Sequence, residues 1–418
     1  MTAIGEYSKA TVRKFMVNGI DLGQSVRQIY VGSSLMTPFV FVSVSLVDAS
    51  RIQDAVYEPG VPLELVYTSG SGKTIIEPPN LVTLGNRAGF KIGGNRAGGT
   101  EIAFVSKSYF NLQQEHTSFH QNVTADAALQ KLHKELDSSA SLTVTKTKGM
   151  IADQEPLHIN RVRLGQGINL IRSRMTDEKY KSGAYTYYQD LEGNYFAMPI
   201  EEIFDKSKSG GPLYTQFMGG QSWVNDQRRM AYNIFSHKKG AVGNEQGSDF
   251  SGDYQSTLKQ AGQDKPKTGF DWGSMTYTPP SATDFNPADR KTPGDTSWKG
   301  DKPKMPNIVN HKFNYDANQK TSENFEHDKA RQNVIAAITS QGSMTINVAL
   351  EGGIEAQIGK GCGIEMPSEV GTGNYSKSSS SGSHTVVAVG HYLNMGDDGI
   401  AAYAALQLAS GGKQGSIA

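Results

Sequence analysis

Alternation of apolar with small or polar side chains constrains the fold of this chain more than any other feature. Segment 39–47 (FVFVSVSLV) places valine and leucine on one side of an extended backbone and serine on the other. Segment 344–350 (MTINVAL) alternates in the same way, as does the series Cys362, Ile364 and Met366. Successive side chains of a strand point to opposite faces, so this period of two predicts half-buried β-strands. Both ends of the chain are therefore predicted to be rich in β-structure.

Glycine-rich turns separate the predicted strands. The residues SGSG at 69–72 lie between extended segments at 63–68 and 74–76, and MGDDG at 395–399 joins strands at 384–393 and 400–408. Both patterns predict hairpins. The pentapeptide GNRAG occurs twice, at 85–89 and 94–98, and predicts a flexible loop. With a further strand at 101–110, the first 110 residues are predicted to form a small barrel or sandwich.

The middle of the chain mixes helix and strand. Thr124 is a suitable N-cap and Asp126 follows it in the first turn, where the helix dipole favours a negative charge. Three leucines then recur at helical spacing, and a second apolar series predicts another helix. Segments 184–189 and 195–198 flank DLEGN and predict a hairpin. The apolar positions of the two helices are Leu129, Leu132 and Leu136, followed by Ile168, Ile171 and Met175.

Residues 240–318 differ from both neighbouring regions. They are rich in Gly, Pro, Lys, Asp and Ser, and segments such as TPP at 278–280 and KPKMP at 302–306 do not continue a helix or a central strand. We expect a long irregular excursion that becomes ordered on neighbouring subunits. After it, a helix over 330–338 is predicted to end at Gly342, and the tail from Ser410 is expected to be loose.

Composition excludes several classes of protein. Lys+Arg and Asp+Glu are 41 each, so no bulk charge attracts the chain to nucleic acid or to an anionic membrane. Cys362 is the only cysteine, which excludes an internal disulfide and a cysteine zinc cluster and fits folding in a reducing cytoplasm. The N-terminal residues lack the apolar core of a signal peptide. The most apolar run, 39–47, is about half the length of a membrane-spanning helix.

Two motifs suggest ligand binding, and for each of them a structural role without a ligand is favoured. Segment 70–74 (GSGKT) ends like a phosphate-binding P-loop, but the required first glycine is replaced by Tyr67 and the segment lies between two predicted strands. A hairpin turn is the better interpretation. His116 and His120 have the spacing of a metal-binding pair, but Thr117 stands where a zinc protease has glutamate. They are expected to be exposed or partly buried histidines in a strand or loop.

No other group of residues predicts an active site. The acidic pairs Glu201–Glu202 and Asp397–Asp398 are adjacent in sequence, whereas glycosidases place two carboxylates across a cleft. Cys362 lies in a predicted strand, where a small core residue is commoner than a nucleophile. No Gly-x-Ser-x-Gly segment occurs. We therefore predict no catalytic residues, no cofactor and no metal ligands.

Basic and aromatic residues alternate within the excursion and raise the alternative of nucleic-acid binding. Five aspartates lie among them, at 271, 284, 289, 295 and 301, so a solvated loop or a protein–protein arm is the favoured interpretation. The residues of this stretch are Lys265, Lys267, Trp272, Tyr277, Arg290, Lys291, Trp298, Lys299, Lys302 and Lys304.

The order of segments resembles the baseplate hub family of contractile phage tails, which includes the late-control proteins of temperate phages. The segment SSLMTPF at 33–39, the long strand that follows it and GVPLEL at 60–65 resemble the family's opening barrel. The strand at 101–110 and the helix after Thr124 resemble the crossing into its second domain. Segments 344–350, 358–364 (IGKGCGI) and 384–391 resemble the closing part of a second tube-like barrel. The excursion has no counterpart in this resemblance.

This resemblance implies a mainly β fold with an α+β insert. The expected parts are a tube-like β-barrel domain at 1–110, an α+β domain at 111–210, a second tube-like barrel at 211–410 containing the excursion 240–318, and a loose tail at 411–418. It further implies a homotrimeric, pseudo-sixfold ring in the virion baseplate, because two related domains per chain turn threefold into sixfold symmetry. The implied partners are the tail spike, the tail tube or its initiator and the baseplate wedge proteins, with DNA passing through the bore unbound.

Three alternatives remain at this stage. A spike or hub of a related injection machine, such as a type VI secretion system, would need a β-helix or a further barrel after the hub. A tail-associated cell-wall hydrolase would need paired carboxylates or a metal site. A β-rich binding module of unknown ligand would need neither, and it would lack the two-barrel organisation.

Overall fold

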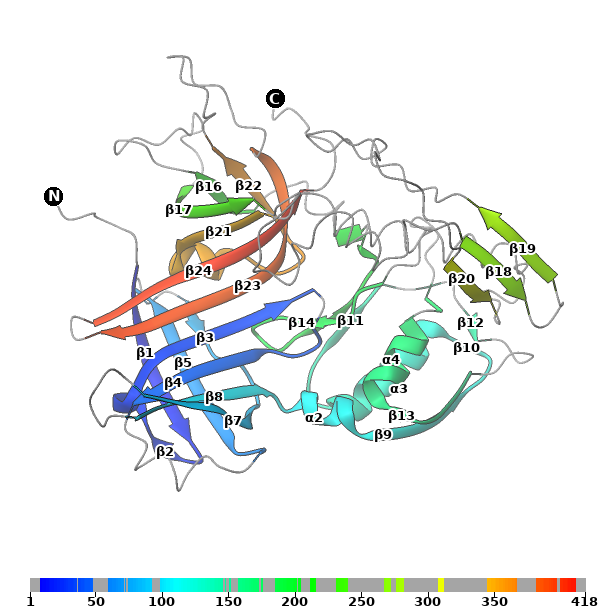
Figure 1. The fold of residues 1–418 in the computed structure, drawn as a ribbon, viewed down its shortest axis with the longest axis horizontal. Helices are drawn as coiled ribbons and strands as arrows, with labels where there is room; N and C mark the ends of the chain where they lie inside the picture. The colour runs from blue at the N-terminus through cyan, green and yellow to red at the C-terminus, as the bar shows by residue number, and fades with distance from the viewer. Residues whose placement is uncertain are drawn as a thin grey trace, which may run out of the picture.

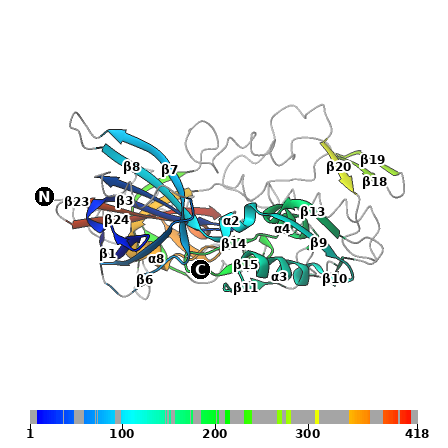
Figure 2. The same ribbon diagram turned by 90° about the horizontal axis from the view of Figure 1, so that it is seen from below.

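The structure is a computed structural model, and its architecture is drawn in Figure 1. Two β-barrels occupy one end of the molecule, and an α+β domain occupies the other end in both views (Figures 1 and 2). The structure describes residues 8–35, 37–47, 59–70, 72, 74–91, 98–145, 147, 150–151, 157–172, 174–175, 185–200, 202–203, 211–215, 231–239, 267–271, 276–281, 307–311, 344–366, 381–396 and 399–410.

The first barrel is a closed cycle of strands in the order β1-β24-β23-β3-β4-β8-β7-β5, with β5 pairing back to β1. Its alternating strands point apolar side chains inward, as Val42, Val44 and Leu46 of β4 do. This confirms the strand predicted from segment 39–47. The strands are β1 (Ser8–Val17), β3 (Val26–Ser34), β4 (Phe41–Val47), β5 (Pro62–Ser69), β7 (Leu81–Lys91), β8 (Gly98–Ser106), β23 (Gly382–Gly396) and β24 (Gly399–Ser410), with β2 (Ile20–Asp21) and β6 (Ile75–Ile76) as short additions.

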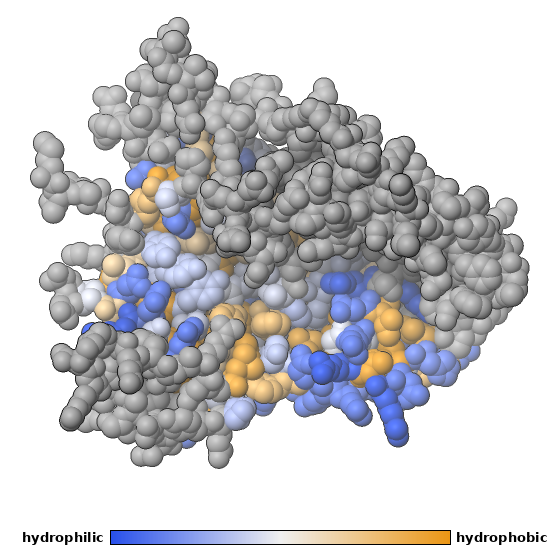
Figure 3. Space-filling view, in the orientation of Figure 1, coloured by the Kyte–Doolittle hydropathy of each residue, from blue (hydrophilic) through white to orange (hydrophobic). Residues whose placement is uncertain are grey.

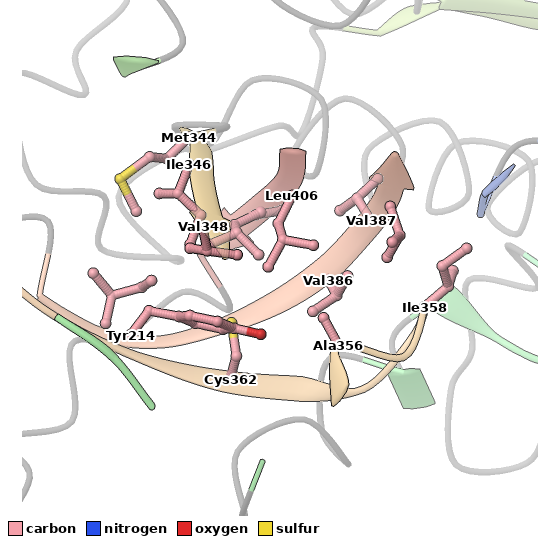
Figure 4. Packing of buried hydrophobic residues seen from close by; sticks show 14 of the residues in the cluster. Tyr214, Met344, Ile346, Val348, Ala356, Ile358, Cys362, Val386, Val387 and Leu406 are labelled. Carbon is pink, nitrogen blue, oxygen red and sulfur yellow. The ribbon is translucent and has the colours of Figure 1, made fainter. Parts of the chain in front are cut away.

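The second barrel closes in the order β24-β21-β17-β16-β22-β23, with β23 pairing back to β24. Figure 4 shows its core, in which Tyr214, Ile346 and Leu406 converge from three different strands. The predicted strands at 344–350 and around Cys362 are confirmed. The strands not yet given are β16 (Leu213–Thr215), β17 (Ala231–Lys239), β21 (Met344–Ala349) and β22 (Gly361–Glu365).

The β23–β24 hairpin belongs to both barrels. Toward its tip, Leu393 and Ala402 enter the first core, whereas Val389 and Leu406 enter the second. The first barrel is therefore not confined to residues 1–110, because two of its eight strands come from the C-terminus. The predicted hairpin is confirmed, and its sharing between barrels depends on pairing with strands more than 300 residues away, which alternation does not reveal.

A short helix, α8 (Leu350–Glu355), fills the space where the barrels meet. Leu350 packs in the first core and Ala356, just after the helix, packs in the second. Gly353 faces the hairpin so closely that an added Cβ would collide with the Cβ of Ala404. Small residues at this crossing let the helix approach both barrels at once.

The α+β domain packs short sheets against two helices. Thr124 caps α3, with its Oγ1 accepting a hydrogen bond from the Ala127 N–H at 3.4 Å, as predicted. No helix in the described ranges is long and apolar enough to cross a membrane. The elements are α2 (Ser108–Gln113), β9 (Glu115–His120), β10 (Val123–Thr124), α3 (Ala125–Leu136), β11 (Leu142–Val144), β12 (Met150–Ile151), β13 (Leu157–Arg163), α4 (Leu164–Arg172), β14 (Tyr188–Gln189) and β15 (Tyr195–Ala197).

Two expectations of irregular structure were wrong in part. The first GNRAG copy lies inside β7, where register shifts after Thr83 and Asn86 accommodate it as bulges. The excursion 240–318 contains a small sheet of β18 (Lys267–Asp271), β19 (Thr276–Ser281) and β20 (Asn307–His311). The two prolines of this sheet, Pro279 and Pro280, lie in β19, which is an edge strand, where the missing N–H is tolerated. The predicted helix at 330–338 and the tail after Ser410 lie outside the described residues.

The close approach of α8 to the hairpin gives a test of the barrel junction. Alanine is favoured over glycine in a helix by about 1 kcal/mol, yet G353A should lower the free energy of unfolding by about 2 kcal/mol because its methyl group collides with Ala404. Urea denaturation measures the change.

The double variant G353A/A404G should recover part of the loss, since it removes the opposing methyl group. Gly396 supplies a control, because a Cβ there meets no atom closer than 3.5 Å. If G353A were as stable as G396A, the helix would not be wedged against the hairpin as described.

Candidate functional site

The P-loop-like segment is a turn between strands. Tyr67 and Thr68 of β5 pair with Ile76 and Ile75 of β6, and the Gly72 N–H donates to the Ser69 carbonyl oxygen at 2.9 Å. A P-loop holds phosphate at the N-terminus of a following helix, and here β6 follows instead. Ser71 and Lys73 lie outside the described residues. The hairpin prediction for this segment is confirmed.

The two histidines with metal-like spacing point from β9 toward α3. His116 Nδ1 lies 2.9 Å from Glu135 Oε2, and His120 Nε2 lies 2.9 Å from Ser118 Oγ. Burial, together with the charges of Lys131 and His116, lowers the pKa of His120. Among the described residues, no group of three or more His, Cys, Asp or Glu side chains is arranged to hold a metal ion.

The remaining chemical candidates are buried or lie outside the described residues. Cys362 is 2% exposed, and burial raises the pKa of its thiol to about 12, so it stays protonated and unreactive at neutral pH. Glu202 is buried and accepts a hydrogen bond from the Thr145 hydroxyl at 2.8 Å. Glu201, Asp397, Asp398 and the basic side chains of the excursion are not among the described side chains.

A buried histidine lies at the barrel junction. His391 of β23 is 1% exposed, and its Nδ1 lies 2.7 Å from the Tyr67 hydroxyl of β5. Burial lowers the pKa of His391 to about 4, and contact with the Gly353 backbone opposes this shift only in part. The neutral imidazole therefore links the hairpin to the far wall of the first barrel as a structural group.

Gln189 joins the α+β domain to the first barrel. It is 2% exposed, and its Oε1 accepts hydrogen bonds from the Ser106 hydroxyl at 2.8 Å and from the Val40 N–H at 3.2 Å. Its backbone N–H donates to the Thr37 carbonyl oxygen at 3.3 Å, and its carbonyl oxygen accepts from the Ser33 hydroxyl. One residue thus ties the β14–β15 hairpin to β3, to the residue before β4 and to β8.

The same hairpin also contacts the second barrel. Leu191 at its turn packs against both barrel cores, and Tyr188 packs in the second. Gly193, at φ +90°, lies so close to Pro79 that an added Cβ would collide with the proline ring. The β14–β15 hairpin therefore holds the two barrels and the α+β domain in fixed relation. Sequence analysis predicted this hairpin but gave no sign that it was a joint.

The outer surface over both barrels carries a continuous face without charged side chains. It follows five adjacent strands that run from β4 through β3, β23 and β24 to β21, and Figure 1 draws them in that order from bottom to top. We call it the charge-free face and define it by the outward residues Phe41, Ser43, Ser45, Val47, Gln28, Tyr30, Gly32, Ser34, Ala388, Gly390, Tyr392, Asn394, Ala401, Tyr403, Ala405, Gln407, Thr345, Asn347 and Ala349.

Aromatic rings cross the middle of this face. Tyr392 and Tyr403 stack with centroids 4.7 Å apart and planes 5° apart, and Tyr30 lies 4.7 Å from Tyr392. The Tyr30 ring covers the backbone of Gly32 and Gly390, where any added Cβ would collide with it. Burial raises the pKa of Tyr30 and Tyr392, so their hydroxyls stay neutral. In Figure 3 the surface over β23 and β3 is correspondingly pale.

Among the described side chains, charged residues lie only at the margins of the charge-free face. Ser43 of the charge-free face donates to Glu101 Oε1 on β8 at 2.7 Å. Arg27 is exposed in the bulge at the start of β3. Charged residues make up 20% of the chain, and soluble surfaces are designed with about 25–35%, so a face of this extent without any points to a specific role.

No protein-family model matches the sequence, and no curated protein matches it. Solved structures do match. A tail protein from Neisseria meningitidis MC58 superposes with a TM-score of 0.54 and 12% identity, covering 96% of each chain. The prophage MuSo2 tail protein from Shewanella oneidensis gives 0.48 and 12% over 97% of each chain. A component of the E. coli type VI secretion system gives 0.43 and 7%, covering 96% of this chain and 76% of that one.

The first of these similarities shows that the chain shares the fold of that tail protein over nearly its whole length. The predicted fold class, mainly β with tube-like barrels and an α+β insert, is confirmed. The similarity extends through the barrels and the α+β domain together, so the arrangement of the parts, and not one barrel alone, is shared.

The Gln189 joint predicts a specific loss of stability. Q189A leaves the Ser106 hydroxyl without its buried acceptor and removes one of the two acceptors of the Val40 N–H, which should lower the free energy of unfolding by about 2 kcal/mol. Hydrogen exchange should also speed up at the Val40 amide and in the β14–β15 hairpin. Exposed Gln130 on α3 supplies the control, and Q130A should change stability by less than about 0.5 kcal/mol. Equal effects of the two variants would contradict the joint.

The buried His391 predicts an acid-sensitive fold. The unfolded chain binds its proton below about pH 6.5, whereas the folded chain does so only near pH 4, so unfolding takes up a proton between these values. This group's stabilisation, of about 3 kcal/mol, should be complete above pH 6.5 and lost as the pH falls to 4.

Urea denaturation at a series of pH values measures this effect. H391Q should be less stable than the parent protein at pH 7 and should lose less stability between pH 7 and pH 4. H158Q removes an exposed imidazole and should stay within about 0.5 kcal/mol of the parent at pH 7. An H391Q variant with the parent's pH dependence would show that His391 is not the group responsible.

Proposed function

We propose that the chain is a structural hub of a contractile phage tail, in which three copies form a ring between the tail tube and the central spike. The observation that carries this proposal is the fusion of two closed barrels through one shared hairpin. A chain with two barrels held side by side converts a threefold assembly into six similar positions, which solves a mismatch between threefold and sixfold partners.

The rigid internal joints support the same proposal. An adaptor transmits position between its partners, so its parts must not rotate freely about one another. Here α8 is wedged between the barrels and Gln189 fixes the α+β domain to the first of them. The fold shared with the tail protein from Neisseria meningitidis supports this role. On this proposal the protein acts by assembly and not by catalysis.

The proposed ring leaves a bore through which DNA passes without being bound. The chain carries no net charge, so it offers no bulk attraction to phosphate. Its partners would be two further copies of itself, the spike, the tail tube or its initiator, and the wedge proteins of the baseplate. Its place would be the baseplate of the virion tail, after synthesis in the host cytoplasm.

Light scattering on the purified protein tests the ring. A trimer has a mass of about 136 kDa, which is three times 45.2 kDa, either alone at high concentration or with the spike protein present. Electron micrographs of the same sample should show six similar densities around a central hole. A mass of 45.2 kDa at every concentration, unchanged by the spike, would contradict the proposal. The chain would then be assayed for cell-wall hydrolysis.

A further inference from the structure

We propose that the charge-free face lines the bore of the ring. This inference rests on the proposed threefold assembly and goes further, because it assigns one particular surface of the chain to the inside. The face spans both barrels without a break, since β3 and β4 belong to the first barrel, β21 to the second, and β23 and β24 to both.

The position of the face excludes contacts between copies. In a ring of six barrels, each barrel has one neighbour in its own chain and one in the next copy. The neighbour in its own chain is reached through the β23–β24 hairpin, so the next copy must lie on the other side of the barrel. The charge-free face is centred on that hairpin, around Tyr392 and Tyr403. In a ring whose barrel axes run along the ring axis, the ends that meet the tube and the spike are strand ends and loops, so this face points either to the bore or to the outside.

The distribution of charged side chains indicates which wall of the barrel faces the bore of the ring and which faces outward. The wall of the first barrel formed by β1 and β5 is an ordinary solvent-exposed surface, where Lys14 pairs with Glu64 and Arg13 is exposed. DNA binds proteins chiefly through phosphate contacts with lysine and arginine, and each such contact would hold the passing strand. Within its nineteen defining residues, the charge-free face offers none. A polyanion meets there only hydroxyls, amides, small side chains and neutral tyrosines.

The tyrosines also make a smooth wall. Tyr392 and Tyr403 cover each other, and Tyr30 lies over the backbone of Gly32 and Gly390. Nucleic-acid bases bind proteins by stacking on open aromatic rings, and rings that are stacked together or lie against the sheet present less open surface for this. The glycines are needed because any side chain at those two positions would lift Tyr30 from the sheet.

The width of the sheet fits a bore of suitable size. The five adjacent strands of the face span about 24 Å at roughly 4.8 Å per strand. Three copies then give a circumference of about 72 Å and a bore about 23 Å across. This is wide enough for a DNA double helix and too narrow for most folded proteins.

Thiol labelling of the assembled ring tests the assignment. The native Cys362 is 2% exposed and unreactive, so a cysteine introduced by N394C reports on the charge-free face, and R13C reports on the opposite wall. Each variant is treated with iodoacetamide, which is small, and with a maleimide coupled to a folded carrier protein wider than the bore. Rates are compared between the ring and the separated subunit at high dilution, with the mass of each sample measured in parallel.

In the ring, N394C should react with iodoacetamide nearly as fast as in the separated subunit, but about tenfold more slowly with the carrier-linked maleimide. R13C should react with both reagents at rates that assembly does not change. If the ring leaves N394C open to both reagents, the face lies outside; if it blocks both, the face is a contact between copies. Either result would overturn the assignment while leaving the ring intact, whereas failure to form a ring would overturn the proposed function as well.

Discussion

The hairpin of β23 and β24 belongs to two closed sheets at once, and most of the structure depends on it. Twelve cross-strand pairs, from His384↔Ser410 to Gly396↔Gly399, hold the two strands together, and their outer edges complete one barrel toward the tip and the other toward the base. A barrel that loses a strand exposes a row of unpaired backbone N–H and C=O groups. Removing this hairpin would open both barrels, so neither is expected to be stable without it.

Because the barrels share a hairpin, their junction is crowded, and small residues lie where the elements cross. Gly353 and Ala404 meet where α8 crosses the hairpin, and a single added methyl group is enough to make them collide. His391 sits beside them with Tyr67 as its partner and stays neutral because burial lowers its pKa. The junction thus combines small residues with one buried hydrogen-bonded pair, and this limits the relative motion of the two barrels.

Sequence reasoning reached the elements whose signals are local. Alternation predicted β4 and β21, the glycine-rich turn predicted the β23–β24 hairpin, and Thr124 marked the start of α3. Sequence patterns did not predict the features that depend on pairing between distant segments. Alternation fixes which side chains of β23 share a face but not that the strand on its edge is β3, so the tyrosine row and the charge-free face remained invisible. Gln189 gave no signal because a buried amide is recognised only by its partners. Bulges explain why a glycine-rich repeat in β7 resembled a loop.

Burial silences the groups that resemble catalytic residues in this sequence. The Cys362 thiol has a raised pKa and the His391 imidazole has a lowered one, each because the group is buried. On the proposed function, the protein acts instead through the outer faces of its sheets. On such a face the informative property is what is absent over many positions, here charge across five adjacent strands. No short motif encodes that property, because it arises only when strands from both ends of the chain pair side by side.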